Sequence, residues 1–273
     1  MGLEILVCIK QVPHPDHFSE IRLDVGSGRI IREGVPAIIN PLDRNALEEG
    51  LRVKERFSGR VTVISMGPPQ AQKALEEALA MGADRGILLC DVAFAGADTL
   101  ATANTLFYAI RKLDKFDLIY CGNETVDSGT AQVGPQLAEL LDIPQVSGVQ
   151  EVAFVDEKTL EVRRALEHGY MKVRLKLPAL LCVTRGINRP RLPTVQSIME
   201  VAQKEMIIWK AKDIGAPPES IGLKGSPTCA AGVYEHKAGR RREIMQGSTE
   251  EKVHRAVAWL KELGAIQRGA KGE

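Results

Sequence analysis

Nearly continuous apolar runs recur along the first two thirds of the chain, and each run is short enough to be a single strand. They lack the strict alternation of a half-exposed strand, which is typical of strands buried on both faces of a parallel sheet. The pattern predicts five such strands: Glu4–Lys10, Arg60–Ser65, Arg85–Cys90, Asp117–Cys121 and Ala179–Thr184.

Between these runs, apolar residues recur at the three- and four-residue spacing of helices that bury one face. Asn40 and Pro41 place a cap residue and an N-terminal proline before the first helix, and the fourth helix ends before Pro144. Alternating strands and helices with short connections predict an α/β fold with a doubly wound, mainly parallel sheet. Two stretches with turn residues at their centres, Ile21–Ile31 and Val149–Arg164, predict inserted hairpins.

The pattern changes after Arg185. We expect a short helix within Thr194–Lys204, followed by a stretch rich in proline and glycine that predicts an extended C-terminal arm. The arm ends in a predicted helix over Ser248–Leu263, which begins with a capping box. Its apolar face needs a surface to pack on, either on its own domain or on a partner. The predicted organisation is a domain over residues 1–204 and an arm over residues 205–273.

Composition narrows the function classes. The chain has 273 residues, and 36 Lys+Arg against 35 Asp+Glu give a net charge of +1, which argues against a dedicated nucleic-acid binder. No apolar run approaches the roughly 20 residues of a membrane span, and no basic leader precedes the first strand, so we expect no signal peptide. Five cysteines without a C-x-x-C pair fit neither a disulfide framework nor a zinc site, and indicate a reducing cytoplasm.

The loops after the predicted strands are where an open parallel sheet binds ligands. In the loop Gly122–Gly134, Pro135 restricts the following helix to a start between Ala131 and Gly134. The amides of Ala131–Gly134 would then be unpaired and, with the helix dipole, would suit a diphosphate. An ordinary capped helix remains the alternative, because neither G-x-x-x-x-G-K-[ST] nor G-x-G-x-x-G is present.

A second loop brings an acid and two hydroxyls to a helix start. Asp98 is a candidate N-cap, and Thr99 and Thr102 share one helix face, where they could hydrogen-bond the polar edge of a ring. The five histidines are scattered, no set of residues completes a metal site, and G-x-S-x-G is absent, so no catalytic residue and no metal is predicted. A binding or redox scaffold whose chemistry belongs to a cofactor fits better.

Seven stretches, taken in order, resemble the small (beta) subunit of electron transfer flavoproteins over nearly the whole chain, to about Leu263. They are Val7–Pro13, Ile39–Ala46, Thr62–Pro69, Ala93–Thr102, Asp127–Pro135, Asn188–Met199 and Gly225–Thr228. The resemblance implies an adenine-nucleotide-binding α/β fold that pairs with a larger alpha subunit carrying a flavin. The arm and its terminal helix would then pack on that partner subunit.

Members of this family hold AMP as a structural ligand or, in the electron-bifurcating branch, a second FAD; AFAGADTLATA and TAQVGP resemble that branch. The resemblance implies that FAD takes a hydride from NADH and passes single electrons to a low-potential acceptor, ferredoxin or flavodoxin, and through the alpha-subunit FAD to a dehydrogenase such as an acyl-CoA dehydrogenase. The first alternative is a non-bifurcating carrier with AMP in the same pocket. The second is a stand-alone nucleotide-binding regulatory protein of the same fold.

Two differences from the bifurcating branch stand out. Asp127-Ser128-Gly129-Thr130 lacks the second acid of D-G-D-T, and Glu167-His168-Gly169 replaces E-G-G. The resemblance and the helix-start argument together give these cofactor-binding candidates: Cys8, Asn40, Asp43, Met66, Asp98, Thr99, Thr102, Gly122, Asn123, Glu124, Thr125, Val126, Asp127, Ser128, Gly129, Thr130, Ala131, Gln132, Val133 and Gly134.

A dehydrogenase-docking segment is also implied by the resemblance. Val195 occupies the place of the family's apolar anchor, and Ile198 and Met199 follow it on the same helical face. The alternative is a helix that packs this face on its own sheet.

Overall fold

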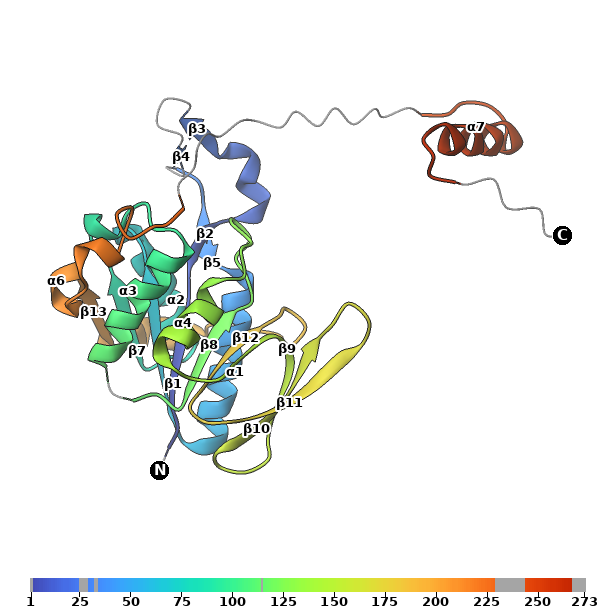
Figure 1. The fold of residues 1–273 in the computed structure, drawn as a ribbon. Coiled ribbons are helices and arrows are strands. Elements are labelled where there is room, and N and C mark those ends of the chain that lie inside the picture. The colour runs from blue at the N-terminus through green and yellow to red at the C-terminus, as the bar shows by residue number, and fades with distance from the viewer. Residues whose placement is uncertain (1, 25–28, 32–33, 114, 229–243, 267–273) are drawn as a thin grey trace. The chain divides into compact units, whose positions relative to one another are not determined.

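The computed structural model describes residues 2–24, 29–31, 34–113, 115–228 and 244–266. The chain forms two compact units, Met1–Gly232 and Val233–Glu273. The predicted α/β fold with a doubly wound, mainly parallel sheet is confirmed in the first unit (Figure 1).

A nine-stranded sheet forms the centre of the first unit, in the order β11-β10-β9-β12-β8-β1-β6-β7-β13. All neighbouring strands are parallel except β9–β10 and β10–β11, which form an antiparallel meander at one edge. The strands are β1 (Glu4–Cys8), β6 (Arg60–Met66), β7 (Arg85–Leu89), β8 (Leu118–Gly122), β9 (Gln145–Phe154), β10 (Thr159–Ala165), β11 (Tyr170–Lys176), β12 (Ala179–Val183) and β13 (Glu205–Trp209).

Two small antiparallel pairs lie outside this sheet. One joins β2 (Gln11–Pro13) to β5 (Ala37–Ile39). The other joins β3 (Arg22–Asp24) to β4 (Arg29–Ile31) and confirms the hairpin predicted over Ile21–Ile31; residues 25–28, between the two strands, lie outside the described residues.

Helices cover both faces of the sheet. Alternate side chains of a strand point to opposite faces, and because both sets are apolar in the central strands, both faces must be buried. Ile5 and Val7 of β1 pack in one core cluster with α1 and α2, whereas Leu6 packs in the other with α3 and α4. Figure 1 shows α3 and α4 together on one side of the sheet. The helices are α1 (Pro41–Phe57), α2 (Gln72–Met81), α3 (Thr99–Lys112), α4 (Val133–Leu141), α5 (Val195–Glu200), α6 (Ala211–Ile214) and α7 (Thr249–Glu262).

Short 3-10 turns connect several of these elements. They are η1 (Pro15–Glu20), η2 (Pro69–Ala71), η3 (Val92–Phe94), η4 (Val201–Gln203) and η5 (Pro218–Ser220). Among the residues that the structure describes, no helix combines the length and the apolar character needed to cross a membrane.

The sheet continues past residue 204, where the sequence placed the start of the arm. β13 pairs in parallel with β7, and Trp209 is buried. Ile214 of α6 and Ile221, after η5, are also buried in the cluster under α3. The part of the chain up to Thr228 therefore belongs to the packed domain, because it supplies apolar side chains to the core.

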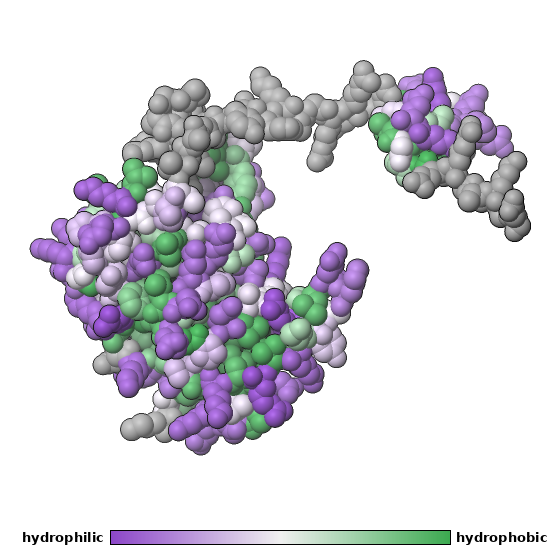
Figure 2. Space-filling model, viewed as in Figure 1, coloured by the Kyte–Doolittle hydropathy of each residue, from purple (hydrophilic) through white to green (hydrophobic). Residues whose placement is uncertain are grey.

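The second unit contains α7, which begins with the predicted capping box between Ser248 and Glu251. No residue of this helix is buried, and its apolar side chains, among them Val253 and Trp259, are exposed. Figure 2 shows hydrophobic side chains beside hydrophilic ones on its surface.

The chain order places a topological switch point at the middle of the sheet. From β1 the chain proceeds outward through β6 and β7, and then returns to β8 on the other side of β1. At such a point the loops after the two central strands diverge to opposite faces and leave a crevice at the carboxyl edge.

Candidate functional site

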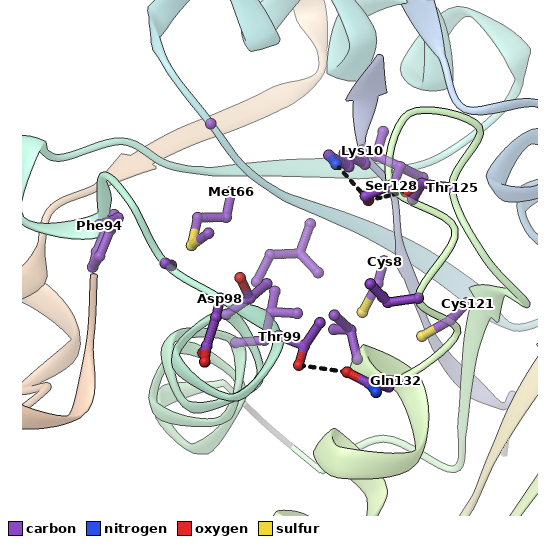
Figure 3. A pocket seen from close by; sticks show the side chains of 18 of the residues that line it. Cys8, Lys10, Met66, Phe94, Asp98, Thr99, Cys121, Thr125, Ser128 and Gln132 are labelled. Atoms are coloured by element: carbon purple, nitrogen blue, oxygen red, sulfur yellow. Dashed lines mark hydrogen bonds between the residues drawn. The ribbon is translucent and has the colours of Figure 1, made fainter. Parts of the chain in front are cut away.

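A cavity of about 1140 Å³ opens at this carboxyl edge, between the loops that follow β1, β6, β7 and β8 (Figure 3). The fold gathers most of the predicted cofactor-binding residues around it, although they come from four separate loops. Those that line it are Cys8, Asp43, Met66, Asp98, Thr99, Thr102, Gly122, Asn123, Glu124, Thr125, Ser128, Thr130, Ala131, Gln132, Val133 and Gly134.

Four predicted residues do not line the cavity: Asn40, Val126, Asp127 and Gly129. They belong to the loop Gly122–Gly134 or support it. The amide of Gly129 donates to the Thr125 carbonyl at 2.8 Å, and φ of Gly129 is 60°, a left-handed value that favours glycine. Gly129 therefore shapes the loop.

The start of α4 carries free amide donors. The helix begins at Val133, inside the predicted interval, and its N-cap residue Gln132 makes no side-chain capping bond. In the described part of the chain, the amides of Ala131–Gly134 donate to no other group. Ala131 has φ 54°, which is unusual for a residue with a side chain and is a form of strain that clusters at ligand sites. Donors and helix dipole together suit an anion.

The start of α3 lies opposite. The hydroxyl of Thr99 donates to Oε1 of Gln132 at 3.0 Å, so the starts of α3 and α4 are joined across the cavity wall (Figure 3). Asp98 is the N-cap of α3, and its Oδ1 accepts from the Ala101 amide at 3.0 Å. Burial raises the pKa of Asp98, but hydrogen bonds from Ala101 and Thr228 outweigh it and lower the pKa below its usual value.

Asn40 occupies the predicted N-cap position of α1 but does not cap the helix with its side chain. Its Nδ2 instead donates to the Glu124 carbonyl at 2.9 Å, and its Oδ1 accepts from the Val126 amide at 3.2 Å. This side chain therefore fixes the loop that follows β8.

Asp43 joins the two central strands. Its carboxylate accepts from the amide of Lys10 at 2.8 Å and from the amide of Gly122 at 3.1 Å, just beyond β1 and at the end of β8. A Cβ on Gly122 would collide with this carboxylate, which explains the glycine there. Burial raises the pKa of Asp43 to about 7, against the opposing effect of the hydrogen bonds from Asn40, Lys10 and Gly122.

Two lysines on the cavity wall were missed by the sequence reasoning. Lys10 Nζ lies 2.8 Å from Asp127 Oδ1, across the entrance to the loop, and 3.5 Å from the Ser128 hydroxyl. Lys10 and Lys210 are the cationic residues among the described residues that line the cavity. Lys10 stands in a loop after a strand and could have been found by its position alone. Lys210 could not, since β13 was not predicted.

An apolar wall was also missed. Phe94, Ile64 and Leu106 line the cavity and are almost completely buried. Figure 3 shows Phe94 and Met66 on one side of the cavity, and Lys10, Thr125 and Ser128 on the other. The cavity is therefore apolar at one end and polar at the other. Phe94 comes from η3, a short turn that no periodicity in the sequence indicates.

Three thiols lie in a row across adjacent strands. Cys8 pairs in register with Cys121, and Cys121 with Cys182. They are free thiols, as is Cys90, while Cys229 lies outside the described residues. No group of His, Cys, Asp and Glu in the described ranges is arranged to hold a metal ion.

The two family differences lie in different places. Gly129, where the bifurcating branch has an acid before the threonine, does not line the cavity, whereas its neighbour Ser128 lines it and contacts Thr125 at 2.7 Å. His168, in contrast, is exposed in the turn between β10 and β11 and does not line the cavity.

The predicted docking residues are exposed: 78% of Val195, 56% of Ile198 and 75% of Met199 is accessible. The preceding segment is held on α1, because Arg191 Nε donates to Glu48 at 2.8 Å and Asn188 pairs with Asn45. The apolar face of α5 is thus not used by the domain's own core.

Fold and cavity define an α/β protein of the doubly wound class, with a ligand site at the switch point of its parallel sheet. A family model described as electron transfer flavoprotein domain matches residues 27–214. The chain belongs to the electron transfer flavoprotein family, and its relatives place it among the beta subunits.

Three relatives show how far the similarity extends. The electron transfer flavoprotein subunit beta of Clostridium acetobutylicum is 47% identical over 260 residues, with 95% of this chain and 98% of the relative covered. Subunit CarD of the caffeyl-CoA reductase-Etf complex of Acetobacterium woodii is 43% identical, covering 97% and 100%. Protein FixA of Azotobacter vinelandii is 41% identical, covering 94% and 93%. Membership among the beta subunits implies an alpha-subunit partner.

Proposed function

We propose that the cavity binds FAD, and that the subunit works with an alpha subunit to divide electrons from NADH between a low-potential acceptor, ferredoxin or flavodoxin, and a dehydrogenase. The observation that carries this proposal is the cavity itself. Its volume of about 1140 Å³ lies just above the roughly 300–1,000 Å³ typical of small-molecule pockets, more than a mononucleotide needs.

The residues present fit a flavin dinucleotide. The free amides of Ala131–Gly134 suit the diphosphate, and Lys10, paired with Asp127, lies on the polar side of the cavity. The apolar wall with Phe94 suits a flat aromatic ring, and the hydroxyls of Thr99 and Thr102 can hydrogen-bond its polar edge. Bound FAD would supply the two-electron and one-electron chemistry.

The chain's own residues position and shield that cofactor. Asn40 and Asp43 fix the loop after β8, and the Thr99–Gln132 bond fixes the two helix starts relative to each other. Leu106 and Phe94 keep water from one side of the cavity because they are packed in the core. Because these protein–protein contacts fix the cavity wall before a flavin binds, the wall would present its polar groups to the flavin in a fixed geometry and so tune the flavin's reduction potential.

The partners are proposed from the relatives and from α5. The Acetobacterium woodii relative is named as a subunit of a caffeyl-CoA reductase-Etf complex. This supports a dehydrogenase of CoA esters, such as an acyl-CoA dehydrogenase, as the second acceptor. The exposed residues Val195, Ile198 and Met199 of α5 are the proposed docking face.

AMP in the same cavity remains the second candidate, because a mononucleotide could use the same amides at α4. The two candidates differ at Thr99 and Thr102, which only a flavin ring would reach. Thr102→Val should weaken FAD binding by about two- to ten-fold, the worth of one hydrogen bond, and leave AMP binding unchanged. Thr99 is kept, because its hydroxyl also holds Gln132 at the start of α4.

The measurement is titration of the nucleotide-free, full-length chain with FAD and with AMP. Thr102→Ser is the matched control, since it keeps the hydroxyl and should retain FAD affinity. Tight binding of AMP together with no binding of FAD by the wild-type chain would refute the proposal.

A further inference from the structure

The segment Ile221–Thr228 lies directly on the rim of the cavity. Its Leu223 amide donates to the Ala95 carbonyl at 3.0 Å, in the loop that leads from β7 to α3. Gly222, with φ 56°, approaches this loop so closely that a Cβ would collide with the Ala93 carbonyl. Ile221 is buried in the core under α3. The segment is therefore fitted to the rim.

Hydroxyl groups fasten the segment at the start of α3. The Ser226 hydroxyl accepts from the Asp98 amide at 2.8 Å and donates to the Gly222 carbonyl at 2.8 Å. The Thr228 hydroxyl and amide both donate to Asp98 Oδ2, at 2.8 and 3.1 Å. Asp98 thus bonds to the segment with its amide and with one carboxylate oxygen.

The other oxygen of the same carboxylate caps α3 through the Ala101 amide. One side chain consequently orients both the segment and the helix start that presents Thr99 and Thr102 to the cavity. Any ligand that stabilises the helix start also stabilises the geometry in which the segment is fastened.

We propose that Asp98 and Ser226 act as a clasp which couples occupancy of the cavity to the fastening of Ile221–Thr228. This inference rests on the proposed nucleotide site. Ser226 is a positioning residue, since it acts on the ligand through Asp98 and α3, whereas Asp98 itself also lines the cavity. The coupling is reciprocal, so a bound nucleotide holds the segment and a fastened segment raises nucleotide affinity.

The position of the clasp in the chain gives it a consequence. Thr228 leads into the second unit, which carries the exposed apolar side chains of α7. A filled cavity would therefore hold the last described residues of the first unit, which end at Thr228.

Ser226→Ala tests the coupling, because Ser226 does not line the cavity and its loss removes no direct ligand contact. The variant should weaken FAD binding by about two- to ten-fold, the worth of one hydrogen bond. Ser220→Ala is the matched control: its hydroxyl bonds to the Pro217 carbonyl within the same part of the chain, and affinity should not change.

Amide hydrogen exchange of residues 220–228 in the full-length chain supplies the second readout. FAD should slow exchange of these amides in the wild type and slow it much less in Ser226→Ala. Thr228→Val should behave in the same way. It leaves the Asp98 cap of α3 in place, so it provides the test if Ser226→Ala does not fold. Wild-type FAD binding with no change of exchange, or unchanged affinity in a folded Ser226→Ala, would overturn the coupling alone. No FAD binding by the wild type would overturn the proposed function and the inference with it.

Discussion

Asp43 stands where the ends of β1 and β8 meet the start of α1, and it carries an unusual protonation equilibrium. Burial raises its pKa to about 7 from an ordinary value of 3.8. Between those two values the folded chain holds a proton that the unfolded chain has released. This group therefore makes the free energy of unfolding fall as the pH rises through that window, and has no further effect above it.

Asp43→Asn should remove this pH dependence. The difference in free energy of unfolding between wild type and variant should be larger at about pH 5 than at about pH 8, by up to about 2–3 kcal/mol, since each pH unit within the window contributes about 1.4 kcal/mol. Urea unfolding of both proteins at the two pH values measures it. A difference that does not vary with pH would contradict the assignment of a raised pKa to Asp43.

Residue types at the site could be predicted better than their roles. Asn40 was expected to cap α1, and it stands at the cap position, but its side chain holds the loop after β8. The spacing of the sequence shows only the local helix and not the carbonyl of Glu124, which is 84 residues away. Lys210 and Phe94 were missed for the same reason, because only the tertiary fold brings them to the cavity.

At the scale of elements, the apolar runs predicted the five central strands correctly, and the apolar spacing with its proline and glycine boundaries predicted the helices between them. Both signals depend only on residues close together in the sequence. The start of α4 was bounded correctly by Pro135. β13 was missed because Glu205–Trp209 is a short edge strand flanked by polar residues. Its pairing with β7 joins segments more than a hundred residues apart, which no local pattern shows. The β9–β11 meander was only half predicted, since β11 is largely exposed.

The packing of α4 on β12 gives a test at this scale. Gly134 faces Cys182 so closely that an added Cβ would collide with Sγ. Gly134→Ala should therefore destabilise the domain by about 1–3 kcal/mol through overpacking. Adding Cys182→Ala should recover much of the loss, because it removes the colliding sulfur.

Urea unfolding of the two single variants and the double variant measures this coupling. If the loss of unfolding free energy in the double variant equalled the sum of the losses in the two single variants, the Gly134–Cys182 contact would not limit how closely α4 approaches β12. A larger residue at Gly134 consequently reports on packing, and variants at this position are poor tests of diphosphate binding.

The exposed face of α5 gives a second test among the elements. Val195→Asp with Met199→Asp should sharply reduce electron flow from NADH to the dehydrogenase, because each apolar side chain contributes about 1–2 kcal/mol when buried by a partner. Since both side chains are more than two thirds exposed, the free energy of unfolding should change by less than about 0.5 kcal/mol per substitution.

Gln196→Asp, on the same helix, is the control and should leave electron flow unchanged. Loss of folding, or of assembly with the alpha subunit, in the double variant would show that this face belongs to the core or to the subunit interface.

At the scale of the whole molecule, the parallel sheet and the family define a beta subunit with a cavity at the carboxyl edge of its sheet, and our proposal is that this cavity holds a nucleotide. Net charge and composition led us to expect neither nucleic-acid binding nor a membrane span, but they could not predict the size of the cavity. That size depends on how far apart the loops after β7 and β8 lie, which is set by the packing of α3 against α4. It is the reason for preferring FAD to AMP.

The most direct test of this claim is the nucleotide content of the complex purified with its alpha subunit. The bound nucleotides are released with acid, separated and quantified against the protein. The account predicts two equivalents of FAD per heterodimer and no AMP, one flavin in each subunit. One equivalent of FAD with one of AMP would contradict it and would make the cavity a structural nucleotide site.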